Sequence, residues 1–224
     1  MKLKPQGRLE RDEGVYSGGI APVEFFFRQE VDCFYAKEAV LDPKLHRLPC
    51  FAQLFQRELD APFATVLMGY TELGLHFSFV VESSKVQVFY PDIEKGDSIQ
   101  LFIDTRDVRQ AKTTHRFCHH FFFLPEAYDE KQCGEITRFR TEETHPLCVS
   151  SELELAVERN RSGYSASIFI PAHVLVGYVP GECPRLGFTY KICRADGAVQ
   201  EFGITSSSTR YDQAPYLWTT MLLK

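Results

Sequence analysis

The sequence has little of what marks export, membrane insertion or nucleic-acid binding. Its first residues read MKLKPQGRLERDEG and lack the apolar core of a signal peptide, and no later apolar run is long enough to span a bilayer. Basic residues form no block, and the net charge is −5. Because phosphate neutralisation needs clustered positive charge, we expect neither a nucleic-acid partner nor a membrane partner.

Paired cysteines are missing as well. The seven cysteines are odd in number and scattered, and no C-x-x-C motif occurs. Scattered free thiols are typical of proteins that work in a reducing cell interior. The cysteine pattern therefore predicts a cytoplasmic protein without a disulfide framework.

The sequence also lacks the common catalytic motifs. It contains no G-x-S-x-G, no H-E-x-x-H and no glycine-rich phosphate loop. The acidic residues between 152 and 158 alternate with apolar ones, which is typical of a solvated strand face rather than a glycosidase pair. We therefore predict no catalytic residue and no cofactor, and a binding function rather than an enzymatic one.

What the sequence does contain is a period-two apolar pattern along most of its length. With 224 residues and a 44% apolar share, the chain can bury a substantial core. Turn signals separate the alternating segments, which predicts an all-β, antiparallel two-sheet β-sandwich of the jelly-roll or immunoglobulin-like kind, with few short helical turns. Residues 20–224 are predicted as one domain behind a mobile arm at 1–19. The predicted strands are 23–28, 63–70, 74–81, 98–104, 115–124, 152–158, 164–170, 186–193, 199–204 and 216–223.

The stretch from Gly96 to Pro125 is the most informative. Alternation predicts that the strands 98–104 and 115–124 each place one row of side chains in a core and the other row on an open face. In the second strand, Cys118 and His120 share one face, and His115 and His119 share the other. A charged loop joins the two strands, and a long polar insertion, 126–143, follows them.

This stretch resembles a known family. The segment DSIQLFID at 97–104 resembles the D-S-hydrophobic-E/Q-L-F-I-D strand of family 9 carbohydrate-binding modules, which belong to a wider group of DOMON-like β-sandwiches. The loop TRD at 105–107 and the segment RFCHHFFFLP at 116–125 are similar to an uncharacterised bacterial branch of that group. The resemblance extends over about 21–223, and it implies a β-sandwich fold and a saccharide or other small polar ligand.

The polar groups of this stretch suggest where such a ligand binds. Carboxylate and guanidinium groups together can hold vicinal hydroxyls, one accepting and the other donating hydrogen bonds. The predicted ligand-binding residues are Asp104, Arg106, Asp107, Arg116, His120 and Trp218. The alternative is structural: the two aspartates and the arginines bond to their own loop, and Trp218 lies in the core. Family 9 modules hold sugars between two tryptophans, a pair that a chain with one tryptophan cannot form.

Two other functions remain open from the sequence. The sheet face can meet a protein partner or a second copy of the chain, and the oligomeric state is not determined. The strand 115–120 can instead serve a metal-dependent or Cys/His enzyme, with Cys118 and His120 as the metal ligands or as nucleophile and base. The surrounding phenylalanines favour packing over metal binding at Cys118 and His120, so no metal is predicted.

Overall fold

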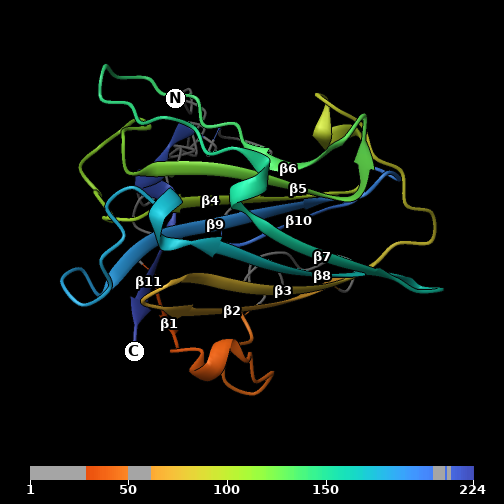
Figure 1. Ribbon diagram of the computed structural model, residues 1–224, viewed down its shortest axis with the longest axis horizontal. Coiled ribbons are helices and arrows are strands. Elements are labelled where there is room, and N and C mark those ends of the chain that lie inside the picture. Colours follow the sequence, from red (N-terminus) through yellow and green to blue (C-terminus); the bar gives the residue numbers. More distant parts are fainter. Residues whose placement is uncertain (1–28, 50–61, 204–209, 211–212) are drawn as a thin grey trace, which may run out of the picture.

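The structure is a computed structural model that describes residues 29–49, 62–203, 210 and 213–224. Two β-sheets pack face to face in it (Figure 1). The predicted arm at 1–19 and the predicted first strand at 23–28 lie outside the described residues. No helical segment among the described residues is long and apolar enough to cross a bilayer.

The larger sheet has the strand order β1-β11-β9-β4-β5-β6, and β10 also pairs with β9. Its strands are β1 (Glu30–Cys33), β4 (Ser98–Asp104), β5 (Cys118–Tyr128), β6 (Lys131–Glu135), β9 (Arg185–Cys193), β10 (Val199–Glu201) and β11 (Thr219–Leu223). All its pairs are antiparallel except the parallel pair of β1 and β11.

The smaller sheet has the order β2-β3-β8-β7 and is antiparallel throughout. Its strands are β2 (Ala64–Thr71), β3 (Gly74–Glu82), β7 (Glu154–Arg159) and β8 (Gly163–Pro171). Short 3-10 turns connect the strands: η1 (Lys37–Ala39), η2 (Ile93–Lys95), η3 (Ser150–Glu152), η4 (Ala172–Val174) and η6 (Pro215–Leu217). The predicted all-β sandwich with few short helical turns is therefore confirmed.

The main core fills the space between the two sheets. Phe77 of β3 stacks on Phe188 of β9, with ring centroids 5.7 Å apart, and Phe79 meets Tyr190 edge to face at 6.3 Å. Alternate residues of β4 and β5 enter the same core, as the period-two pattern predicts. β4 and β5 thus direct their other row of side chains to the outer face of the larger sheet.

Three sequence-based boundaries need correction. β5 begins at Cys118 rather than at 115, because the Cys118 amide closes a turn by donating to the His115 carbonyl at 2.8 Å. His115 therefore precedes the strand and does not share a strand face with His119. The polar segment 126–143 is not only an insertion, since it contains β6. Trp218 lies at the end of η6, one residue before β11.

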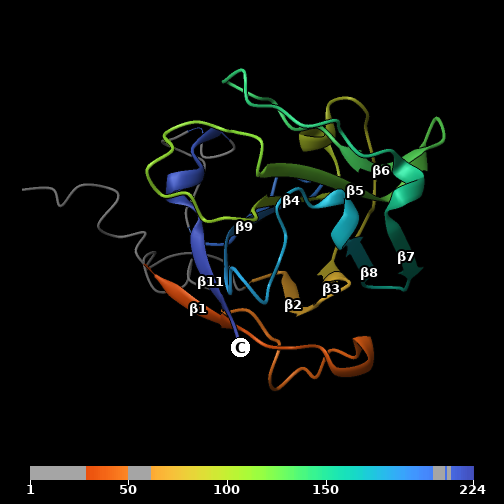
Figure 2. The ribbon, with the colours of Figure 1, turned by 60° about the vertical axis from the view of Figure 1, so that its left-hand side comes forward.

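The outer face of the larger sheet is covered rather than open, and every residue of β4 is buried. One apolar cluster on that face joins Ile93 and Ile136 to Phe122 and Leu124 of β5. A second cluster covers the end of the sheet near the loop that follows β4, and consists of Phe102, Cys118, Ala214, Leu217, Trp218 and Tyr216. Figure 2 shows that loop beside η6 and the start of β11. The two covers leave a cleft between them.

Candidate functional site

The cleft lies over β4 and β5 on the outer face of the larger sheet and has a volume of about 460 Å³. Gln100 of β4 and His120 of β5 form its floor, because outward-facing positions of neighbouring antiparallel strands lie close together. Its walls and rim consist of Pro91, Asp92, Ile93, Glu94, Lys95, Ile136, Arg138, Arg210 and Gln213. Most of these side chains are polar or charged.

His120 is held in one orientation. Its Nε2 atom lies 3.1 Å from Oε1 of Gln100, so the ring donates from Nε2 and keeps Nδ1 as an acceptor. The ring also stacks on Phe102, with centroids 4.1 Å apart. Burial, and then the nearby Arg138 guanidinium, lower the pKa of His120 to about 3. The floor therefore presents a neutral imidazole.

The walls offer further hydrogen-bonding groups. Gln213 accepts a bond from Arg140, but its Nε2 is buried and has no hydrogen-bond partner among the described residues. The exposed Arg138 side chain makes no hydrogen bond or ion pair in the described part of the chain. At the rim, Lys95 pairs with Asp92 at 2.6 Å, and Glu94 pairs with Lys191 of β9 at 2.9 Å. The cleft thus combines donors and acceptors without a large net charge.

The two predicted aspartates lie outside this cleft. Asp104 is buried, and its carboxylate accepts the amides of Arg106 at 3.1 Å and Val108 at 2.7 Å. Asp107 accepts from Arg109 Nε at 3.1 Å and from the Thr220 hydroxyl at 2.8 Å. These are the contacts of the structural alternative: groups of the loop itself occupy the Asp104 carboxylate, and Arg109 of the loop and Thr220 of β11 occupy that of Asp107.

Of the four remaining predicted residues, three lie outside the cleft and one lines it. Arg106 and Arg116 place their guanidinium carbons 5.8 Å and 4.7 Å from the ring centroid of Phe117, away from the cleft floor. Trp218 is 1% exposed and packs on Phe102. Of the six predicted ligand-binding residues, His120 is the one that lines the cleft.

Sequence reasoning missed Gln100, Arg138 and Gln213. Gln100 had a signal, because it occupies the E/Q position of the strand motif that carries the family resemblance. Arg138 and Gln213 had none, since they reach the cleft only through the packing of distant segments on the sheet.

A buried cluster of potential metal ligands lies nearby. Oε1 of Glu135 is 2.9 Å from Nδ1 of His119 and 2.8 Å from Nε2 of His145, and the Thr137 hydroxyl donates to it at 2.6 Å. Nε2 of His119 accepts the Val176 amide at 3.1 Å, so the proton of this ring sits on Nδ1. A protonated Nδ1 cannot bind a metal, and the short distances are those of hydrogen bonds. The cluster is a hydrogen-bonded network centred on a carboxylate.

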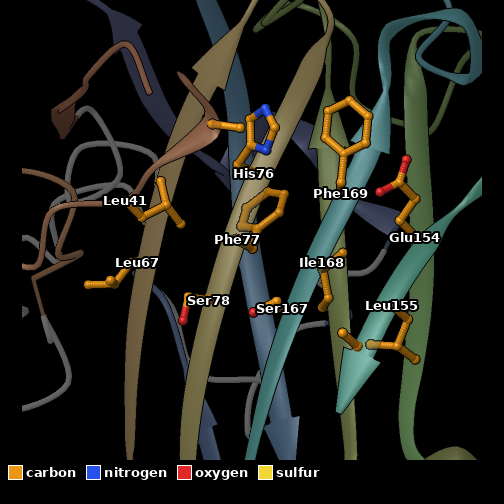
Figure 3. A pocket seen from close by; sticks show the side chains of 12 residues that line it. Leu41, Leu67, His76, Phe77, Ser78, Glu154, Leu155, Ser167, Ile168 and Phe169 are labelled. Carbon is orange, nitrogen blue, oxygen red and sulfur yellow. The ribbon is translucent and has the colours of Figure 1, made fainter. Parts of the chain in front are cut away.

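A second groove, of about 520 Å³, crosses the outer face of the smaller sheet. Figure 3 shows His76 and Phe169 side by side in it, and their rings stack with centroids 4.5 Å apart. Ser78 and Ser167 form part of the floor, and the exposed Glu154 lies at one end. This groove is the second place where a polar ligand can meet an aromatic surface.

Comparison with known proteins identifies the fold. No protein-family model and no curated protein sequence matches the chain. A family 9 carbohydrate-binding module from Caldicellulosiruptor kristjanssonii, solved in complex with cellotriose, is similar with a TM-score of 0.58 and 11% identity over 88% of this chain and 94% of that chain. A structure described as a family 9 module from the same organism in complex with glucose has a TM-score of 0.54 and 12% identity, over 88% of this chain and 95% of that chain. The chain therefore has the β-sandwich fold of these modules.

Proposed function

We propose that the chain is a non-catalytic binding module for a saccharide or another small polyhydroxylated ligand, held in the cleft above Gln100 and His120. The observation that carries the proposal is the cleft floor, where a neutral imidazole and an amide are fixed side by side. The fold supports it, because both similar modules were solved with a sugar bound. As a finer proposal, we assign the chain to the DOMON-like bacterial branch whose motifs it resembles.

The cleft suits a neutral ligand rich in hydroxyl groups. A hydroxyl both donates and accepts, so it can donate to Nδ1 of His120 and accept from Nε2 of Gln213 or from Arg138. A volume of about 460 Å³ falls within the range of small-molecule sites. Because the carboxylates of Asp92 and Glu94 are paired with lysines, we assign them to the rim rather than to acid–base chemistry.

The cysteines bear on the proposed location. The six described cysteines are free, and Cys50 lies outside the described residues. Free thiols support the proposal that the module works in a reducing compartment such as the cytoplasm.

The test begins with a thermal-shift screen and a glycan array that include glucose and cellotriose. A ligand that binds only the folded chain raises the melting temperature by mass action. For any sugar that does so, calorimetric titration should show binding at least about 10-fold weaker in His120→Ala, since one good polar contact contributes about 1.4 kcal/mol or more.

Phe169→Ala is the matched control, because it removes one aromatic ring from the groove on the other sheet. Its affinity should equal that of the unaltered chain. If Phe169→Ala weakened sugar binding and His120→Ala did not, the sugar site would lie in that groove and the cleft would be rejected. Silence across the screen and the array would reject sugar binding in favour of a protein partner or self-association.

A further inference from the structure

Three ligand-type side chains from different parts of the chain meet near the end of β4. Asp104 ends β4, His115 lies in the loop before β5, and Cys118 begins β5 directly opposite Asp104. One carboxylate oxygen, one ring nitrogen and the sulfur all lie within 4.8 Å of one another. All three residues are buried, with exposures of 1%, 6% and 0%. They are separate from the proposed sugar cleft, which they do not line.

One polar atom of this cluster lacks a proper partner. Nε2 of His115 is buried and makes no hydrogen bond among the described residues, and it lies 3.5 Å from Oδ2 of Asp104. Such a distance is too long for a good hydrogen bond. Two ligand atoms that lie 2.0–2.2 Å from one tetrahedral ion are separated by roughly 3.3–3.6 Å. In the network around Glu135, by contrast, the corresponding distances are 2.9 and 2.8 Å.

We propose that Asp104, His115 and Cys118 bind one zinc ion or a similar divalent ion. Thiolate, imidazole and carboxylate are the three kinds of side chain that bind zinc in proteins. The charges also fit a buried position, because a divalent cation neutralises one carboxylate and one thiolate together. Without the ion, the Asp104 carboxylate is buried beside an imidazole that meets it only at 3.5 Å.

The protons balance in a simple way. Burial, and then the Asp104 carboxylate, raise the pKa of Cys118, so the metal-free chain carries a thiol at neutral pH. Binding forms the metal–sulfur bond and releases the thiol proton to solvent. The proton of His115 moves from Nε2 to Nδ1, which gives up the long 3.4 Å contact from the Phe117 amide. Asp104 keeps its two amide bonds, because each carboxylate oxygen has a second lone pair.

The position of the cluster indicates a structural role for the ion. It joins the start of the loop at Asp104, the loop's last part at His115 and the strand that follows at Cys118. Cys118 also packs in the cluster that contains Leu217 and Trp218, so an ion here would tie the loop under that cover. The loop carries Arg106 and Arg116, and the ion would hold both guanidinium groups near Phe117.

The test uses the full chain, made without a metal-binding tag, freed of metal by a chelator and then titrated with Co²⁺ and Zn²⁺. The unaltered chain should bind one ion, show the near-ultraviolet absorption of a cobalt–thiolate bond, and gain thermal stability with Zn²⁺. Cys118→Ala should lose the absorption and bind at least about 100-fold more weakly, since even outer partners of a metal site contribute 10–100-fold. Cys193→Ala is the matched control, because Cys193 is a buried cysteine of the same sheet. This variant should leave the cobalt absorption and the metal affinity unchanged.

Further variants keep the proposal falsifiable if Cys118→Ala does not fold. His115→Ala changes a loop residue and should weaken binding to the same degree, and Asp104→Asn should weaken it while Asn retains an oxygen for the loop amides. No stoichiometric ion in the unaltered chain would overturn the proposal. So would metal content that survives both Cys118→Ala and His115→Ala, or that is lost only in His145→Ala, which would place the ion in the Glu135 cluster.

Discussion

Nε2 of His145 lies 2.8 Å from Oε1 of Glu135, and its Nδ1 lies 2.7 Å from the backbone carbonyl oxygen of Arg116. The ring therefore bridges the carboxylate of Glu135 and the backbone just before β5. The pair is buried, and Oε2 of the same carboxylate accepts the Cys148 amide at 2.9 Å. Glu135 therefore attaches the segment after β6 to the larger sheet through a charged hydrogen-bond network.

Replacement of Glu135 by glutamine should lower the free energy of unfolding by about 1.5–3 kcal/mol, because the buried groups that bond to this carboxylate lose a charged acceptor. Urea denaturation followed by fluorescence measures the change. Glu154→Gln removes an exposed carboxylate from β7 and should cost less than about 0.5 kcal/mol. Equal effects in the two variants would show that the charge at position 135 does not stabilise the fold.

The same carboxylate predicts how stability depends on acid. Burial alone would raise the pKa of Glu135, but the hydrogen bonds from His119 and His145 outweigh it and lower that pKa below its ordinary value of 4.5. The unfolded chain therefore binds a proton at a higher pH than the folded chain. The stabilisation is fully present above about pH 4.5 and is lost as the pH falls toward the folded-state pKa.

The free energy of unfolding, obtained from urea denaturation, should fall between pH 6 and pH 3. This single group contributes a slope of up to about 1.4 kcal/mol per pH unit. Glu135→Gln has no such proton to take up, so its slope over the range should be smaller. Parallel pH profiles for the two proteins would contradict the assignment.

The sequence predicted the strands well, because burial of one face of a strand between two sheets produces an alternation of apolar and polar residues. The prediction for 98–104 coincides with β4, and that for 74–81 differs from β3 by one residue. Alternation reports which row of a strand faces the main core, and in β3 that row, with Phe77 and Phe79, is almost fully buried. These features depend on residues close together in the chain.

The candidate site was less predictable, since it depends on contacts between distant segments. Polar Gln100 and Asp104 suggested an open face, but segments around residues 93 and 218 cover it. No local pattern shows that the Asp104 carboxylate is occupied by the amides of its own loop. Nor does one show that the register of β4 and β5 sets His120 opposite Phe102 and beside Gln100.

The loop after β4 allows a direct comparison of a structural and a surface residue. In metal-free protein, Asp104→Ala should cost about 1.5–3 kcal/mol or more, because two backbone amides lose a charged acceptor. Arg106→Ala removes a partly exposed guanidinium 5.8 Å from the Phe117 ring, and should cost less than about 1 kcal/mol. Chemical denaturation of both variants measures the difference. A larger cost for Arg106→Ala would make that arginine, not the aspartate, the residue that holds the loop.

The cysteines make a final prediction about native reactivity. Burial raises the pKa of four described thiols: to about 12 for Cys33 and Cys148, to about 11 for Cys193, and above its ordinary value for Cys133. Since the thiolate is the reactive form, these groups should react slowly with a disulfide reagent at pH 8. Cys118 belongs with them, because burial raises its pKa too.

Cys148 and Cys183 are the two described thiols that are only partly buried, and burial raises the pKa of Cys148. Cys183 should therefore be the fast-reacting thiol in a Cys50→Ser background, which removes the cysteine outside the described residues. In the native Cys50→Ser protein, one thiol per chain should react rapidly with the disulfide reagent. No thiol should react rapidly once Cys183→Ser is added. In denaturant, without a reducing agent, the Cys50→Ser protein should show six thiols. Fewer than six would reveal a disulfide and argue against the reducing compartment proposed for the chain. Rapid reaction that persists in the double variant would instead mean that one of the interior thiols is reached by local opening of the sheet.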